Sequence, residues 1–349
     1  MLDFLREPEE HPELFFSLVD DGIHGLIRFA ALNAASTLHL FDHLEKGPGT
    51  LQELSHTTGI DEGRLFPLLG VLISAGVIVC AEGKYQNSPL ASTYLVSISP
   101  YSQNSHIHKN ALFLEKIWAC LPKRLTGEPL IIPHTEFFAN LALPAMAENA
   151  LTGRLQRTVA EIAGMPEFAS AGKMVDLGGG HGLYAIALSA LNPGLDAYIF
   201  DLPHITALAE RYIRKYHAAR VFTIPGDFFS DDIGGRYDLI LSSSNPSGKS
   251  AVLLRKIADA MNDGGLFVNI QSDNGDRDDV YHAFEWQLWT LDNEEKGKGH
   301  YSREQPFMTA EYREAMAKAG FRILLEKQIR DDYHRGSSVH MVIAKKVTG

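Results

Sequence analysis

The spacing of apolar and polar positions changes near residue 171 and predicts different elements on either side. Before that point apolar residues recur at helical spacing, as in 26–32 and 38–41. After it, short apolar strands alternate with amphipathic helices, which indicates an α/β fold with a doubly wound parallel sheet. The predicted strands are 174–177, 197–200, 221–224, 237–241 and 266–270, and the predicted helices are 182–191, 204–217 and 249–262.

The first hundred residues predict short helices followed by a hairpin. Thr50 and Glu53 have the spacing of a capping box, which starts a helix over 51–57. A second helix over 62–74 precedes a strand, turn and strand within 77–85. Helix, turn, helix and hairpin in this order is a winged-helix pattern.

Charge argues against DNA as the partner of this winged helix. Residues 1–100 contain 13 Asp and Glu but only 5 Lys and Arg, and the whole chain has a net charge of −11. Contacts to phosphate supply most of the non-specific affinity for DNA, and this region has few cations to make them. We therefore expect no nucleic-acid partner, and a dimerisation or lid role for this region.

The length of 349 residues favours more than one domain. We expect a winged-helix domain over 1–100, a helical linker and substrate-pocket region over 101–170, and a cofactor-binding catalytic domain over 171–349. Within the middle region, helices are predicted over 112–125 and 146–162.

Other features of the sequence predict a cytoplasmic protein. Cys80 and Cys120 are too few for a disulfide framework and are expected to be small buried hydrophobic residues. The first eight residues carry acids and no apolar core, so no signal peptide is expected. The apolar uncharged run 65–81 is shorter than a membrane span, so no membrane partner is expected.

The strongest chemical signal is the segment Val175–Gly182, Val-Asp-Leu-Gly-Gly-Gly-His-Gly, between a predicted strand and a predicted helix. Glycine is needed where a backbone turns sharply and a ligand lies against it. The spacing is not the dinucleotide pattern G-x-G-x-x-G, and no Lys-Ser/Thr follows as in a phosphate-binding loop. Asp176 places a carboxylate beside the ligand, which suits a cationic or hydroxyl-rich group.

Two further acids follow the next two predicted strands. Asp201 ends the second strand, where a carboxylate can accept hydrogen bonds from both ribose hydroxyls. Asp227 and Phe228 follow the third strand and supply an acid and an aromatic ring for an adenine. Three acids at consecutive strand ends therefore predict a ligand made of adenosine and a positively charged group.

With these motifs the sequence resembles the S-adenosyl-L-methionine-dependent O-methyltransferases of the plant caffeate and animal hydroxyindole type, including their bacterial and archaeal relatives. The resemblance covers almost the whole chain. The segments that carry it are 118–121, 176–182, 200–203, 226–228 and 319–321. It implies a Rossmann-like doubly wound methyltransferase sheet preceded by an all-helical winged-helix dimerisation domain. It also implies a homodimer, with S-adenosyl-L-methionine as cofactor and a small, aromatic or planar molecule as acceptor.

The resemblance also assigns cofactor-binding residues. Gly178 and Gly180 would approach the methionine part, whereas the nucleoside would be held by residues after the second and third strands. The complete set of expected cofactor-binding residues is Asp176, Gly178, Gly180, Asp201, Leu202, Asp227, Phe228 and Ser242. The acidic segment 271–279 lacks the spacing of a calcium loop, and we propose no metal.

The sequence departs from the family at the catalytic base. Plant-type members use a histidine after the fourth strand, steadied by two acids. Counting back from 263–265 places that position at Ser243, and counting forward from Asp238 places it at Ser247. No histidine occurs between 217 and 282, and Gln287 and Gly299 align with the two supporting acids.

Three interpretations of the missing base remain open. The acceptor can be an enolate carbon, nitrogen, sulfur or an already ionised oxygen, none of which needs a strong base. Alternatively, His282, His300 or Tyr301 replaces the base. In the third interpretation the chain binds the cofactor but catalyses a non-methylating reaction.

Overall fold

The computed structural model describes residues 9–129, 137–245, 250–272, 280–281, 284–285, 288, 309–331 and 337–347. The chain divides into two units, Met1–Leu112 and Phe113–Gly349. The division into three functional regions expected from the sequence stays a prediction.

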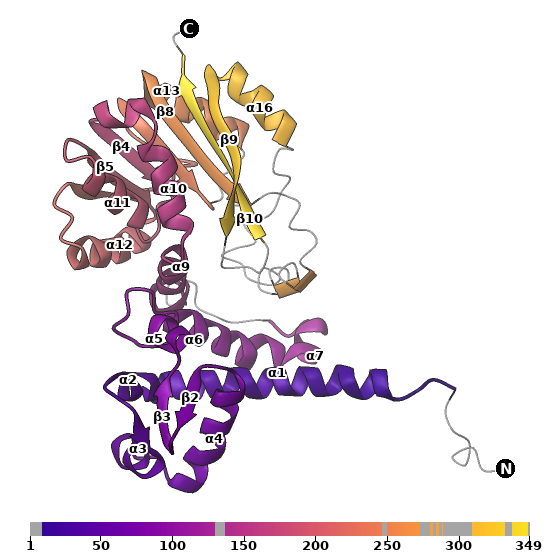
Figure 1. Cartoon of the computed structure of the whole chain (residues 1–349). Helices are drawn as coiled ribbons and strands as arrows, with labels where there is room; N and C mark the ends of the chain where they lie inside the picture. The colour runs from indigo at the N-terminus through magenta and orange to yellow at the C-terminus, as the bar shows by residue number, and fades with distance from the viewer. Residues whose placement is uncertain are drawn as a thin grey trace. The chain divides into compact units, whose positions relative to one another are not determined.

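The first unit combines helices with a small antiparallel sheet (Figure 1). The sheet has the strand order β1-β3-β2. Its helix–turn–helix and hairpin confirm the winged-helix pattern, and Thr50 and Glu53 form the predicted capping box. The elements are α1 (Glu13–Thr37), α2 (Leu40–Glu45), β1 (Gly49–Thr50), α3 (Leu51–Thr58), α4 (Glu62–Ser74), β2 (Ile78–Ala81), β3 (Lys84–Asn87), α5 (Pro89–Tyr94) and α6 (Asn104–Phe113).

The expectation that Cys80 is buried is wrong. Strand β2 lies at the edge of the small sheet, and only Ile78 among its residues is buried. Cys80 is exposed, and Cys120 in the second unit is half-buried.

Several short helices lead to the large sheet of the second unit, and they correct two predictions. The helix expected over 112–125 is interrupted at Ala119 and Cys120, just before Pro122. The helix expected over 146–162 is broken at 151–153, because Gly153 has a φ of 133°, outside the helical region. The elements are η2 (Leu114–Trp118), α7 (Leu121–Leu125), η3 (Phe138–Ala142), α9 (Leu143–Ala150), α10 (Arg154–Ala163) and η4 (Pro166–Ser170).

In the described residues, seven strands form one mixed sheet with the order β6-β5-β4-β7-β8-β10-β9. The first five in this order run parallel, as predicted, and β10 is antiparallel to both of its neighbours. The strands are β4 (Lys173–Leu177), β5 (Asp196–Asp201), β6 (Val221–Pro225), β7 (Tyr237–Ser243), β8 (Met261–Ser272), β9 (Phe321–Asp331) and β10 (Ser337–Lys346).

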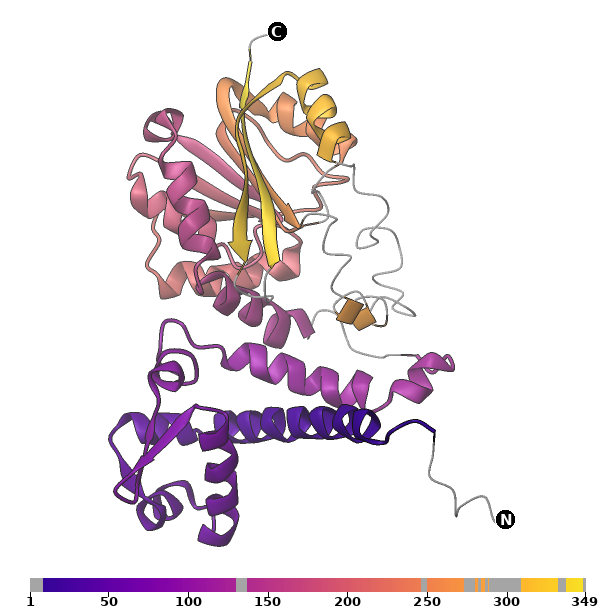
Figure 2. The ribbon, with the colours of Figure 1, turned by 45° about the vertical axis from the view of Figure 1, so that its right-hand side comes forward.

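Helices cover both faces of this sheet (Figures 1 and 2). Residues of α10, α11 and α12 pack on one face, and residues of α13 and α16 pack on the other. The predicted end of α13 is wrong, since Met261 and Asn262 begin β8 instead. Besides α10, these helices are α11 (Leu183–Leu191), α12 (Pro203–Lys215), α13 (Ala251–Ala260) and α16 (Thr309–Lys318).

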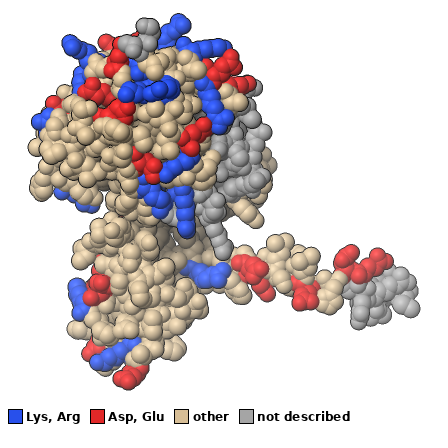
Figure 3. All heavy atoms as spheres, turned by 45° about the horizontal axis from the view of Figure 1, so that its top comes forward, with Lys and Arg blue, Asp and Glu red and all other residues tan. Residues whose placement is uncertain are grey.

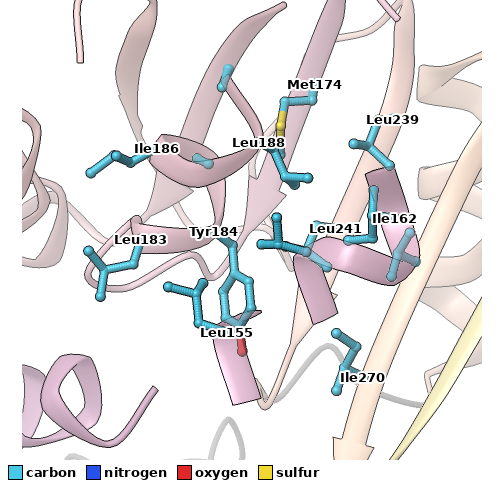
Figure 4. Close-up of a cluster of buried hydrophobic side chains, with 14 of the residues drawn as sticks. Leu155, Ile162, Met174, Leu183, Tyr184, Ile186, Leu188, Leu239, Leu241 and Ile270 are labelled. Carbon is cyan, nitrogen blue, oxygen red and sulfur yellow. The ribbon is translucent and has the colours of Figure 1, made fainter. Parts of the chain in front are cut away.

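Alternating side chains of the central strands form the two cores. Leu239 and Leu241 of β7 face α10 and α11, whereas Ile240 between them faces α13 and α16. Figure 4 shows the first of these clusters, in which Met174 and Tyr184 lie among aliphatic side chains. Burial of each such side chain stabilises the fold by roughly 1.5–3 kcal/mol. The sheet is therefore a rigid support for the loops at its ends.

The strand order reverses between β4 and β7. From β4 the chain moves outward to β5 and β6, and it then returns to place β7 on the other side of β4. At such a switch point the loops leave in opposite directions, and a ligand crevice forms at the carboxyl ends of the strands. Among the described residues no helix is long and apolar enough to cross a membrane.

Candidate functional site

The three acids singled out from the sequence lie at one edge of the sheet. Asp176 is the next-to-last residue of β4, Asp201 is the last residue of β5, and Asp227 follows the end of β6 by two positions. The registers pair Leu177 with Phe200 and Asp201 with Pro225, so the three strand ends are level. The acids therefore share the carboxyl edge that borders the switch point.

Asp176 and Asp201 form a buried carboxyl pair. The side chain of Asp176 is almost inaccessible to solvent, and its Oδ2 has no hydrogen-bond partner among the described residues. Burial, reinforced by the nearby Asp201 carboxylate, raises the pKa of Asp176 to about 8. Burial also raises the pKa of Asp201, to about 6. Both carboxyl groups therefore keep their protons to higher pH than exposed aspartates do.

Backbone amides hold Asp201 in place and limit the rise of its pKa. Its Oδ2 accepts a hydrogen bond from the Gly180 amide at 2.9 Å, and its Oδ1 accepts one from the Leu202 amide at 2.8 Å. The glycine loop and the start of α12 are therefore joined through this one carboxylate. Leu202 is half-buried at the beginning of α12.

The glycine loop adopts the backbone conformation that its sequence predicts. Gly178, Gly180 and Gly182 have φ values of 65°, 54° and 71°, in the left-handed region that favours glycine. A Cβ on Gly182 would overlap Cδ1 of Ile199, and a Cβ on Gly179 would lie 2.8 Å from Cγ of Asp176. The loop thus folds closely over the acid at the end of β4.

His181, inside the same loop, is a structural residue. Its Nδ1 accepts a hydrogen bond from the Leu183 amide at 3.1 Å, in the first turn of α11. Burial and the nearby Arg154 lower the pKa of His181 to about 3, so its ring is neutral at physiological pH. Its ring lies 6.3 Å from those of Tyr184 and Tyr212. It therefore supports the loop and the start of α11.

Asp227 and Phe228 shape the loop after β6. Asp227 accepts a hydrogen bond from the Phe229 amide at 2.9 Å, and its own amide donates to Asp231 Oδ2 at 2.8 Å. Phe228 is buried in the core that also contains Phe200, and its ring lies 4.8 Å from that of the more exposed Phe229. Phe229 offers a partly exposed aromatic ring that was not expected from the sequence.

Ser242, near the end of β7, is buried and donates a hydrogen bond to Asn245 Oδ1 at 3.2 Å. Asn245 was not anticipated from the sequence. Its side chain reaches across to β4, where Nδ2 donates to the Leu177 carbonyl. The local signal was the turn-forming pair Asn-Pro after three serines, which indicates a turn but no contact.

The catalytic base expected by resemblance is not found in the described part of the β7 loop. Ser243, one of its two aligned positions, is a half-buried residue that ends β7. The other position, Ser247, lies outside the described residues, as do Gln287, Gly299 and the candidate bases His282, His300 and Tyr301. These three candidates stay predictions. Within the described residues no cluster of three or more His, Cys, Asp or Glu could hold a metal.

Comparison with known families agrees with this architecture. Residues 145–322 match the O-methyltransferase domain, and residues 21–97 match the O-methyltransferase dimerisation domain. The first match covers just over half of the chain. The chain therefore belongs to the O-methyltransferase family, and the resemblance noted in the sequence is confirmed.

Relatives extend over most of the chain. An uncharacterised protein of Methanocaldococcus jannaschii is 33% identical over 331 residues, covering 92% of this chain and 88% of that protein. The 3-hydroxy-5-methyl-1-naphthoate 3-O-methyltransferase of Streptomyces sahachiroi is 26% identical, covering 71% and 75%. The N,N-dimethyltransferase OxyT of Streptomyces rimosus is 27% identical, covering 68% and 73%. By their names, these last two enzymes methylate oxygen and nitrogen, respectively.

Solved structures confirm the fold. An O-methyltransferase family protein from Burkholderia thailandensis superposes with a TM-score of 0.72 at 22% identity, covering 98% of this chain and all of that one. Human N-acetylserotonin methyltransferase, solved in complex with SAM, superposes with a TM-score of 0.69 at 22% identity, with the same coverage. The arrangement of a helical dimerisation domain before a methyltransferase sheet is therefore that of the family.

Proposed function

We propose that the crevice at the carboxyl ends of β4 to β7 binds S-adenosyl-L-methionine, and that the protein transfers its methyl group to a small planar acceptor. The observation that carries this proposal is the unpartnered, buried Oδ2 of Asp176 beside Asp201. A buried acid without a partner is costly unless a cation or donor satisfies it. A sulfonium nucleoside with an amino group brings both positive charge and donors.

The order of the strands matches the parts of such a ligand. Asp201 and Leu202 would hold the ribose and adenine, Asp227 and Phe228 the adenine, and Gly178, Gly180 and Ser242 the methionine part. Neighbouring strands lie about 4.8 Å apart, so β6 to β7 span roughly 14 Å. An extended adenosine with an amino-acid chain on its 5′ carbon requires a binding site of about this length.

When bound, the cofactor supplies a methyl group on a positively charged sulfur, already activated for displacement. What remains for the chain is to hold the acceptor atom in line and to exclude water. Because the sequence has no histidine between 217 and 282, we infer an acceptor that needs no strong base: nitrogen, carbon, sulfur or an already ionised oxygen. The similarity to an N,N-dimethyltransferase supports this inference.

The experiment uses S-adenosyl-L-methionine labelled in its methyl group and three planar acceptors: an arylamine, an acidic phenol and an ordinary phenol. We expect label in the arylamine or the acidic phenol at pH 7. Methylation of the ordinary phenol should rise about tenfold per pH unit toward the phenol's own pKa, since ionisation must occur without help. A fast, pH-independent reaction of the ordinary phenol near pH 7 would show that the chain has its own base.

The absence of the usual histidine also favours a second candidate, a cofactor-binding protein that catalyses a non-methylating reaction. The same experiment separates the two. Calorimetric binding of S-adenosylhomocysteine without label in any product supports this candidate, whereas any labelled product excludes it. Absence of binding contradicts both.

We also infer that the chain forms a homodimer through its first unit, since α1 exposes many apolar side chains. Figure 3 shows mostly uncharged surface along the N-terminal part of this helix, with a few acidic groups. Soluble monomers rarely expose a large continuous apolar patch to water, so such a patch indicates an interaction surface. The exposed apolar residues of α1 are Leu14, Phe15, Phe16, Leu18, Val19, Ile23, Leu26 and Ile27.

A double substitution of Leu14 and Leu18 by glutamate tests the dimer. The two residues lie one helical turn apart and are 80% and 73% exposed, so the charges do not disturb the core of the unit. We expect wild-type chain to sediment at twice 38.6 kDa, and the variant at 38.6 kDa. Asp21→Asn, on the same helix, should leave the mass unchanged. A monomeric wild type, or a dimeric double variant, would contradict the assignment.

A further inference from the structure

Asn245 connects the two strands that flank the switch point. Its Nδ2 donates to the carbonyl of Leu177 in β4, and its Oδ1 accepts from Oγ of Ser242 in β7. Both strands end at this level, with Leu177 in register with Ser242. The asparagine therefore closes the carboxyl end of the gap between β4 and β7.

The backbone after β7 is shaped to direct this side chain. Ser244 has a φ of 50°, in the left-handed region that a residue with a Cβ seldom adopts. Its amide donates to the Ile270 carbonyl of β8 at 2.8 Å, which ties the turn to the neighbouring strand. The chain bends sharply after Ser244, and Asn245 lies over the end of β4. Strain of this kind persists only where surrounding contacts enforce it.

Asn245 fixes one peptide group from one side while β5 fixes it from the other. The Leu177 carbonyl, which accepts from Asn245, and the Gly178 amide belong to the same peptide unit. The Gly178 amide donates to the Phe200 carbonyl of β5 at 2.8 Å. The plane of the peptide that starts the glycine loop is thus held by both neighbouring strands.

The contact with Gly178 is also close. A Cβ on Gly178 would lie 2.9 Å from Nδ2 and 3.0 Å from Cβ of Asn245, so the amide packs directly against the glycine. Gly178 itself has a left-handed φ of 65°. The direction in which the loop leaves β4 therefore depends on Asn245.

We propose that Asn245 is a positioning residue for the amino-acid end of the cofactor, because it fixes the Leu177–Gly178 peptide on which that end lies. This inference rests on the proposed function of the crevice. The nucleoside end lies at β5 and β6 in that proposal, with Asp201 and Asp227. Asn245 acts at β4 and β7, so its effect should be confined to the part of the ligand beyond the 5′ carbon.

Two ligands that differ only in that part provide the test. S-adenosylhomocysteine carries the amino-acid chain, whereas 5′-methylthioadenosine has a methyl group in its place. We expect Asn245→Ala to weaken calorimetric binding of S-adenosylhomocysteine about tenfold, consistent with loss of a hydrogen bond in the binding site. Binding of 5′-methylthioadenosine should stay within about twofold, since the nucleoside part of the site is unchanged.

Asn262→Ala is the matched control, because Asn262 also joins backbone and side chain across strands. Its Nδ2 donates to Asp238 Oδ1 at 2.7 Å and to the Arg236 carbonyl at 3.1 Å, at the amino end of the sheet. This variant should lower the melting temperature and leave both affinities within about twofold. A purely structural role for Asn245 would give the same result as Asn262.

Asn245→Asp keeps the volume and replaces the donor by an oxygen facing the Leu177 carbonyl. Asn245→Asp should also weaken binding of S-adenosylhomocysteine selectively. If the alanine variant does not fold, the aspartate variant is used to test the proposal. Unchanged affinity for S-adenosylhomocysteine, or equal loss of both ligands, would overturn the role of Asn245. Failure of the wild type to bind either ligand would instead remove the proposed function, and this inference with it.

Discussion

Replacing Asp176 with asparagine is expected to weaken binding of S-adenosyl-L-methionine roughly 10- to 100-fold, the range for hydrogen bonds to a charged group. The variant retains the size of the side chain but removes the negative charge that would face the cationic end of the ligand. Calorimetry at pH 7.5 measures the effect. Of the substitutions considered, this one should impair the cofactor site most.

The same variant should change how binding and stability depend on pH. Because the pKa of Asp176 in the fold is about 8, against its ordinary value of 3.8, the folded chain keeps a proton that the unfolded chain releases. This group therefore makes the wild type less stable as pH rises from about 4 to about 8. A bound cation favours the ionised acid, so wild-type affinity should increase between pH 6 and 7.5. Both trends should be weaker in Asp176→Asn.

Asp196→Asn is the control for the change of charge. Asp196 begins β5 at the opposite edge of the sheet, where it is paired with Arg220 at 2.8 Å and is partly exposed. Such surface pairs contribute about 0–1 kcal/mol, so neither cofactor affinity nor its pH dependence should change appreciably. If Asp176→Asn bound the cofactor as tightly as the wild type, the acid would not be its counter-charge.

Replacing Gly182 with alanine should destabilise the catalytic unit by roughly 2–4 kcal/mol, from left-handed strain and from overpacking. The φ of Gly182 is 71°, and the new Cβ would overlap Cδ1 of Ile199 in β5. Denaturant unfolding followed by circular dichroism measures the loss. Cofactor affinity should fall as well, because Gly182 precedes α11 at the end of the glycine loop.

Gly172→Ala separates this effect from the general cost of losing a glycine. Gly172 precedes β4 without a left-handed φ, and its Cβ would lie an ordinary 3.7 Å from Asp238 Oδ2. Stability should change by no more than about 0.5 kcal/mol. Equal losses in the two variants would mean that the conformation at Gly182 is not what demands glycine.

The sequence predicted those features that depend on local spacing. The capping box at Thr50 and Glu53 involves residues three positions apart, and the structure has both of its hydrogen bonds. The strand predicted over 237–241 is also present, as β7 (Tyr237–Ser243). The acids at 176 and 201 meet because parallel strands end at the same edge, which follows once the strands are recognised.

Features that depend on distant partners were not predictable in this way. Asn245 reaches Leu177, 68 positions away in the chain, and nothing in its local sequence indicates that contact. Cys80 is exposed although Ile78, two residues earlier in β2, is buried, and the local spacing gives no sign of this difference. One continuous helix was predicted over 146–162, but the chain leaves the helical conformation at Gly153. Whether a glycine is tolerated in a helix or breaks it depends on its packing, which the local sequence does not show.

The residues assigned to the cofactor site come from one continuous segment of the chain, and this affects how the protein can be engineered. Every residue assigned to that site lies between Asp176 and Asn245, within β4 to β7 and their loops. The later strands complete the sheet but contribute none of these groups. Libraries that vary only positions after Ser272 should therefore leave the affinity for S-adenosyl-L-methionine unchanged. This separation of the cofactor-binding residues from the later strands offers a practical starting point for laboratory evolution.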